Sequence, residues 1–133
     1  MTVDSNDVTR WFVEYLDTFT ACGRGESDTA SLLAYYGVPL LLTTDGGSFA
    51  LTSDEQVVAA VQPQVDAMRA AGYHRSEILE SEVVVLNSTS ALYRGTFSRV
   101  RSDGGEISRL TVTYLVTDGA TGRRISALAV HSP

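Results

Sequence analysis

The sequence contains no lysine, a single cysteine, only three prolines and no long run of apolar residues. Its ten basic residues are all arginines, and sixteen acidic residues outnumber them, which gives a net charge of −6. This balance argues against broad electrostatic attraction to nucleic acid or to an anionic membrane surface. No apolar stretch approaches the roughly 18 residues that a membrane span needs. Cys22 alone can form neither an internal disulfide nor a cysteine-based metal cluster.

The composition is that of a folded protein, with 44% hydrophobic residues in a chain of 133. This length predicts one domain over residues 1–133 with one substantial core. The first ten residues are polar and lack the charged start and apolar segment of a secretory signal, so we expect a cytoplasmic protein. No metal-ligand spacing relates Cys22, Asp45, His74 and His131, and we expect no metal and no cofactor.

Helical spacing of apolar residues marks the first third of the chain. It predicts a helix over about 8–22, and a second, short helix over about 27–36. Short side chains with oxygen atoms that can cap the first helix precede it: Ser5, Asn6 and Asp7.

The middle of the chain predicts a small hairpin and then a long helix. Residues 38–44 and 48–51 form two short apolar strands around a turn at 45–47. Ser53 and Gln56 have the spacing of a capping box, so a helix begins there and continues to about residue 71. Pro63 removes one hydrogen bond inside that helix, and we expect a kink.

The second half of the chain reads as four long strands, over about 73–86, 90–101, 106–117 and 123–131. Helices, a hairpin, a helix and then strands give an α+β fold. In this fold the helices pack on one side of a curved antiparallel or mixed sheet.

Alternation along the strands sorts the two faces of the sheet. A two-residue turn at Asp103-Gly104 pairs Tyr93 with Tyr114 and Phe97 with Leu110 on an apolar, concave side. A three-residue loop at 87–89 and a four-residue turn at 118–121 would extend this side. The residues they add are Val85, Val83, Ser81, Leu79, Ile125, Ala127 and Ala129.

The opposite side faces solvent or another subunit and includes Glu80, Glu82 and Arg94. Glu80 and Glu82 are interpreted as part of an outward ion pair with Arg94 rather than as a catalytic pair. A two-residue loop at 87–89 would instead turn both carboxylates inward.

One polar row crosses the concave side in this register: Glu77, Arg99, Ser108 and His131. A carboxylate, a guanidinium and an imidazole in one row could orient a substrate and move a proton, with His131 as the general acid–base. The alternative is a polar rim joined by an ordinary Glu77–Arg99 ion pair.

Several marks stand in a fixed order along the chain. They are an aromatic first helix with Trp11-Phe12, Tyr15 and Phe19, the segments 35–39 and 52–55, and a last strand that opens at 122–125 and ends in His131. With these marks in this order, the chain resembles the SnoaL-like, or nuclear transport factor 2 (NTF2)-like, superfamily over nearly its whole length.

The resemblance implies a cystatin-like, cone-shaped α+β barrel with a cavity between the concave sheet and the helices. It also implies a homodimer through the outer sheet face. Members include ketosteroid isomerases, polyketide cyclases, dehydratases and domains without catalysis, so the fold does not settle the function. The isomerases use a buried tyrosine with an acidic partner and an aspartate base. This sequence has Tyr15, Tyr93 and Tyr114 but no Asp or Glu in the middle of the concave face.

These observations favour a domain that binds a small hydrophobic molecule in an apolar cavity. The residues expected to line the cavity are Tyr15, Phe19, Tyr93, Phe97 and Tyr114, with Glu77, Arg99 and His131 at its polar end. Two alternatives stay open: a cofactor-independent isomerase, cyclase or dehydratase that uses His131, and a protein-interaction or dimerisation module without catalysis.

Overall fold

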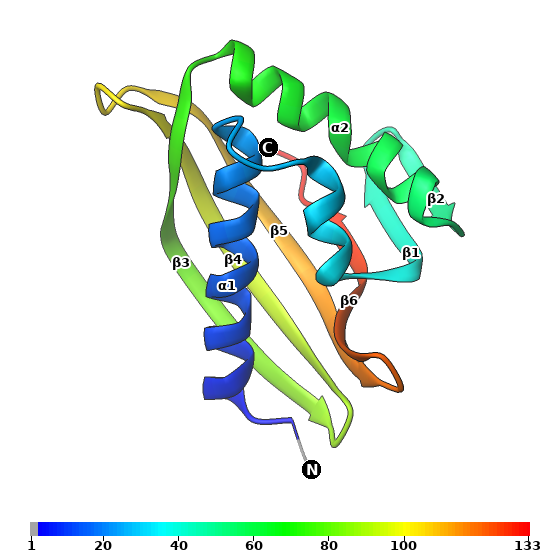
Figure 1. Ribbon diagram of the computed structural model, residues 1–133. Coiled ribbons are helices and arrows are strands. Elements are labelled where there is room, and N and C mark those ends of the chain that lie inside the picture. The colour runs from blue at the N-terminus through cyan, green and yellow to red at the C-terminus, as the bar shows by residue number, and fades with distance from the viewer. Residues whose placement is uncertain (1–2) are drawn as a thin grey trace.

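The aromatic pattern near the start of the chain forms helix α1, Ser5–Gly23, in the computed structural model, which describes residues 3–133 (Figure 1). Asp4 caps this helix, because its carboxylate accepts from the backbone N–H groups of Asn6 at 2.9 Å and Asp7 at 3.2 Å. The prediction that a residue of 5–7 provides the cap is therefore wrong by one position. A short 3₁₀ helix, η1, follows over Thr29–Ala34.

The long second helix, α2, covers Asp54–Ala70 and contains Pro63. Ser53 caps it as the spacing predicts, since its hydroxyl accepts from the Gln56 N–H at 3.1 Å. The Gln56 side chain accepts in turn from the backbone N–H of Thr52 at 2.7 Å. Within residues 3–133, neither α1 nor α2 has the length and apolar content of a membrane-spanning helix.

Six strands form one mixed sheet in the order β2-β1-β6-β5-β4-β3. Strand β1 pairs in parallel with β6, and all other neighbours are antiparallel. The strands are β1 Tyr36–Thr44, β2 Gly47–Leu51, β3 Tyr73–Asn87, β4 Ser90–Arg101, β5 Glu106–Gly119 and β6 Gly122–Val130.

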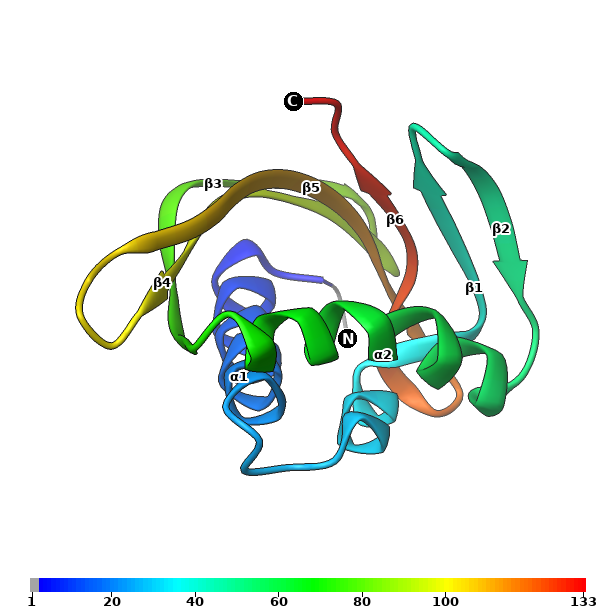
Figure 2. The ribbon, with the colours of Figure 1, turned by 90° about the horizontal axis from the view of Figure 1, so that it is seen from above.

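The sheet curves, and both helices and η1 lie on its concave side, as Figure 2 shows from above. The predicted α+β class with a curved mixed sheet is confirmed. The sheet is open, because β2 and β3 form its two edges, so it does not close into a barrel.

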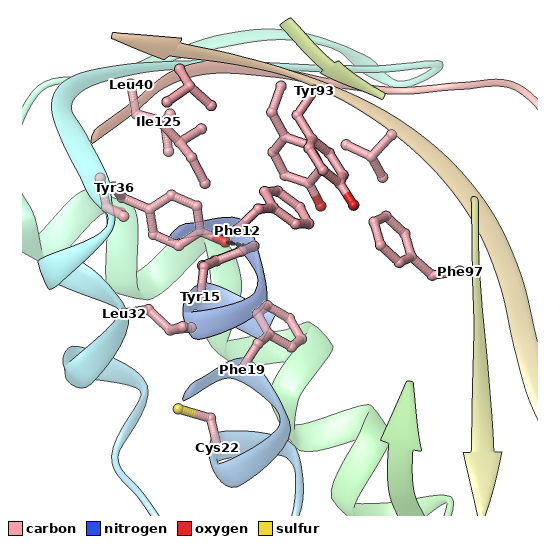
Figure 3. Packing of buried hydrophobic residues seen from close by; sticks show 14 of the residues in the cluster. Phe12, Tyr15, Phe19, Cys22, Leu32, Tyr36, Leu40, Tyr93, Phe97 and Ile125 are labelled. Atoms are coloured by element: carbon pink, nitrogen blue, oxygen red, sulfur yellow. Dashed lines mark hydrogen bonds between the residues drawn. The ribbon is translucent and has the colours of Figure 1, made fainter. Parts of the chain in front are cut away.

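Phe12 of α1 occupies the centre of the core and is fully buried. Its ring stacks on Tyr93 with the centroids 3.7 Å apart (Figure 3). It also meets the Tyr114 ring edge-on, with the centroids 4.8 Å apart. Cys22 is also fully buried, as expected for a small core residue. The aromatic face of α1 therefore anchors the helix to the middle of the sheet.

The register between β4 and β5 agrees with the prediction, with Tyr93 opposite Tyr114 and Phe97 opposite Leu110. The half of β3 next to its turn also agrees, since Val83 lies opposite Tyr93. The turn has two residues, 88–89, rather than the predicted three, and the insertion of Leu86 restores the register, so Glu80 and Glu82 do not turn inward.

Three residues of β3, His74, Leu79 and Leu86, and one of β6, Ser126, have no partner on the neighbouring strand. The predicted alignment therefore fails in β3 from Leu79 toward its start, and in β6 beyond Ser126. The insertions at Leu79 and Ser126 decide which polar side chains reach the concave side.

Candidate functional site

The predicted row of four polar residues does not form. Beyond Glu80, the register of β3 shifts by one residue at Leu79, so Ile78 rather than Leu79 lies opposite Phe97. As a result Ser76 is the neighbour of Arg99, and Glu77 points to the outer side. The Glu77 carboxylate is exposed and accepts from Arg75 at 2.8 Å. The prediction that Glu77 joins Arg99 in the cavity is wrong, because a β-bulge reverses the side on which each later residue lies.

His131 also lies on the outer side of the sheet. The turn before β6 has two residues, since Gly119 pairs with Gly122, and Ser126 is inserted as a bulge. Ala127 and Ala129 consequently face outward, contrary to the prediction, whereas Ile125 faces the core as predicted. The exposed imidazole of His131 is 2.7 Å from the Thr113 hydroxyl. His131 therefore cannot act as a general base in the cavity.

Of the four residues in the predicted row, Arg99 alone lines the cavity. Ser108 lies opposite Arg99 as predicted but is exposed. Glu80 and Glu82 lie on the outer side, where Glu82 is opposite Arg94 as the sequence predicts. The carboxylates of Glu77, Glu80 and Glu82 are thus directed away from the cavity.

A pocket of about 350 Å³ lies between α2, the concave side of β1 and β6, and the second half of α1. Three lining residues, Thr44, Ala60 and Gln64, are also exposed, which puts the mouth of the pocket between α2 and the end of β1. The wall is mostly apolar. Its apolar aliphatic members are Leu40, Leu42, Leu51, Ala60, Val61, Leu110, Val112, Leu128 and Val130.

The predicted aromatic lining is present in part. Tyr15, Phe19 and Tyr114 border the pocket. Tyr93 does not, because it is 1% exposed and its ring is covered by Phe12. Phe97 borders only a smaller space of about 20 Å³ beside Arg99. The pocket therefore lies nearer to α2 and β1 than the sequence suggests.

Three buried tyrosines from different elements meet at the inner end of the pocket. The hydroxyl groups of Tyr15 and Tyr36 are 2.6 Å apart, and Figure 3 shows these two side chains directed at one another from α1 and the start of β1. Burial raises the pKa of Tyr36 to about 12. Burial, with the neighbouring phenols, also raises the pKa values of Tyr15 and Tyr114. All three phenols stay protonated at neutral pH and act as hydrogen-bond donors rather than as bases.

Arg99 supplies the charge of the pocket. Its guanidinium lies over the Phe19 ring, 5.7 Å from the ring centre. The Gln64 side-chain oxygen, in the amide orientation that satisfies both groups, accepts from the two terminal nitrogens of Arg99 at 2.6 and 2.9 Å. Burial lowers the pKa of Arg99, but a guanidinium remains charged at any physiological pH.

Two residues whose hydrogen bonds shape this site, Tyr36 and Gln64, were not predicted from the sequence. Tyr36 is the first residue of β1 and follows Tyr35, and only the position of the strand start decides which of the two rings turns inward. Gln64 lies one residue after Pro63 in α2, where nothing in the sequence distinguishes it from a surface glutamine.

The pocket holds hydrogen-bond donors and one cation but lacks a base. Among the described residues that line it, none is Asp, Glu, His or Cys. Residues 3–133 also include no group of three or more His, Cys, Asp or Glu side chains placed to hold a metal ion. The arrangement can orient a bound molecule and stabilise negative charge, but it cannot abstract a proton at neutral pH.

Comparison with known proteins agrees with this architecture. A family model described as "NTF2-like protein (DUF6841)" matches residues 5–133. The chain belongs to this NTF2-like family. The NTF2-like part of the resemblance is thereby confirmed, while the match does not single out the SnoaL-like group. No curated protein matches the sequence significantly.

Solved structures with the same fold span the length of this NTF2-like chain. A domain of unknown function with a cystatin-like fold from Nostoc punctiforme is 23% identical, with a TM-score of 0.72 over 100% of this chain and 80% of that one. An NTF-2 like protein of unknown function from Shewanella oneidensis is 17% identical, with a TM-score of 0.67 over 93% and 98%. A putative calcium/calmodulin dependent protein kinase II association domain from Xanthomonas campestris is 16% identical, with a TM-score of 0.67 over 98% and 89%. At these identities the likeness concerns the fold alone.

Proposed function

We propose that this NTF2-like protein binds a small, largely apolar molecule in the pocket between α2 and the concave side of the sheet. The observation that carries the proposal is a pocket of about 350 Å³ that stays open although the neighbouring core around Phe12 is tightly packed. Ligand pockets measure roughly 300–1,000 Å³ and combine an apolar wall with a few convergent polar groups. Here Tyr15, Tyr114 and Arg99 are those groups.

Binding without turnover is favoured over the isomerase, cyclase or dehydratase alternative. Those reactions need a base near the substrate. His131, the candidate base, is exposed on the far side of the sheet, and the tyrosines at the pocket hold their protons at neutral pH.

The experiment is a fluorescence titration with prodan, a neutral dye whose emission depends on the polarity of its surroundings. The native protein is expected to bind it with a blue-shifted emission. Ala60→Phe puts an aromatic ring into the pocket and should weaken binding by about tenfold or more. Ala59→Phe adds the same ring to the same helix outside the pocket, and should leave binding unchanged. Equal binding by both variants, or no binding by the native protein, would contradict the proposal.

We further propose that two copies associate through the outer face of the sheet. A continuous apolar row crosses five strands there, with each residue opposite the next: Leu41, Ala127, Leu115, Leu92 and Val84. Leu41 is 46% and Val84 43% exposed, so part of this row is in contact with water in a single chain. Contiguous apolar surface of this kind is typical of an interface, and a two-fold axis lets one such row cover its own copy.

A further inference from the structure

Arg99 is the one charged side chain among the described residues that line the pocket. Its strand β4 brings it to the concave side, three residues before the turn into β5. None of the ion pairs formed within residues 3–133 includes it, although the chain has an excess of acidic residues. A cation is therefore placed in an apolar pocket without a carboxylate to balance it.

The surroundings of Arg99 satisfy the guanidinium only in part. Gln64 accepts two of its N–H groups and Phe19 lies against its face, and both partners are electrically neutral. A guanidinium has five N–H donors arranged to match a carboxylate. Withdrawing such a charge from water is costly unless an anion compensates for it. The unused donors thus favour an anionic partner that is not part of this chain.

The pocket wall facing away from Arg99 is aliphatic, with Leu42, Leu128 and Val130 from β1 and β6. The phenol of Tyr114 lies on the same side as Arg99 and keeps its proton, so it adds a neutral donor beside the cation. A molecule that fills the pocket therefore meets donors and positive charge at one end and hydrocarbon at the other.

We propose that the ligand is a small apolar carboxylic acid, bound as its anion with the carboxylate on Arg99 and the hydrocarbon body against the aliphatic wall. This inference rests on the proposed function, because it requires that the pocket take up a ligand. The proposed ligand carries one negative charge, because a single guanidinium balances a single carboxylate. Binding is expected to be independent of metal ions and of the outer face of the sheet.

The test compares cinnamate with cinnamamide, which has the same shape and no charge. Isothermal titration calorimetry at neutral pH is expected to give tighter binding of cinnamate by about tenfold or more, the gain typical of charge-assisted hydrogen bonds. Arg99→Met should remove this preference. Gln64→Glu, on the exposed side of α2, should also reduce it by at least about threefold, because its carboxylate would occupy the guanidinium in place of the ligand.

Arg94→Gln is the matched control, since Arg94 lies on the same strand but on the outer face, where it is exposed. This variant should keep the full preference for cinnamate. Equal affinities of the native protein for acid and amide, or a preference that survives both Arg99→Met and Gln64→Glu, would overturn the inference while leaving the pocket proposal intact. If prodan binds but neither cinnamate nor cinnamamide does, the inference alone fails. If none of the three binds, both proposals fail.

Discussion

The buried hydroxyl groups of Tyr15, Tyr36 and Tyr114 set the chemistry of the pocket at the scale of single residues. Each phenol comes from a different element, and the 2.6 Å contact between Tyr15 and Tyr36 joins α1 to the start of β1. Their pKa values are raised first of all by burial, so they remain neutral donors where an exposed phenol would begin to ionise. Because burial raises these pKa values, the stability of the folded protein depends on whether the phenols are protonated.

The free energy of unfolding should fall as the pH rises above 10. The pKa of Tyr36 is 10.0 in the unfolded chain and about 12 in the folded protein, so the unfolded chain loses the proton first and alkaline pH favours unfolding. Stability from this group is complete below pH 10 and decreases by about 2 kcal/mol as the pH approaches 12. Urea denaturation across this range measures the decrease.

A native absorbance titration of the phenols provides the second readout. Tyr15, Tyr36 and Tyr114 are expected to ionise later in the folded protein than in urea. Tyr36→Phe should show a smaller loss of stability between pH 10 and 12 than the native protein. Superimposable native and denatured titration curves would contradict this description of the site.

Among the elements, the packing of β4 against α1 requires that the Phe97 ring lie close to Gly95, where there is no side chain. A Cβ atom at Gly95 would lie 3.0 Å from Cε2 and 3.1 Å from Cε1 of the Phe97 ring, which is buried near Phe12 with the ring centres 6.0 Å apart. Gly95→Ala should therefore displace this ring and lower the free energy of unfolding by about 1–3 kcal/mol, measured by urea denaturation.

Gly119→Ala is the control for that variant. Gly119 lies at the end of β5, where a Cβ atom would meet nothing within 4 Å. Its substitution should change stability by less than about 1 kcal/mol. An equal effect of the two substitutions would show that the Phe97 ring can move without cost and that its contact with Gly95 does not contribute to the free energy of unfolding.

The elements also show how far the sequence predicts this structure. Helical spacing and turn residues were sufficient for both long helices, the strand order in the chain and the pairing of Tyr93 with Tyr114, because each depends on local periodicity. The site residues depended on register far from the turns. A single inserted residue at Leu79 and another at Ser126 moved Glu77 and His131 to the outer face.

Neither insertion has a sequence signal, because no glycine or proline adjoins Leu79 in β3 or Ser126 in β6. Arg99 is placed as predicted because the β4–β5 register holds from Arg99 to Ser90. The turn itself has three residues, 102–104, rather than the predicted two, and the insertion of Ile107 in β5 restores the register. The pairing at the centre of the sheet was predictable because the insertion of Ile107 offsets the longer turn, whereas no change of turn length offsets the insertions at Leu79 and Ser126.

At the scale of the whole molecule, the concave side is covered by helices and the convex side is not (Figure 2). The dimer proposed for that outer face predicts a solution mass of twice 14.3 kDa by sedimentation equilibrium. The double variant Leu41→Glu and Val84→Glu places a negative charge at each end of the apolar row, and it should have the mass of a single chain. Both side chains are exposed in the single chain, so the variant should still fold.

Val13→Glu is the matched control for the dimer. Val13 is equally exposed, at 43%, but lies on α1 away from the outer face of the sheet. It should leave the mass of the dimer unchanged. A native protein with the mass of one chain, or a double variant that stays dimeric, would count against an interface at this row.

A crystal structure of the protein grown with cinnamate would show whether the pocket and its single cation bind a carboxylic acid. We expect the carboxylate within hydrogen-bond distance of the Arg99 guanidinium. The aromatic ring should lie against Leu42 and Leu128, beneath α2. A pocket closed by α2 would exclude ligand binding there, and cinnamate bound with its carboxylate away from Arg99 would exclude Arg99 as the anion site.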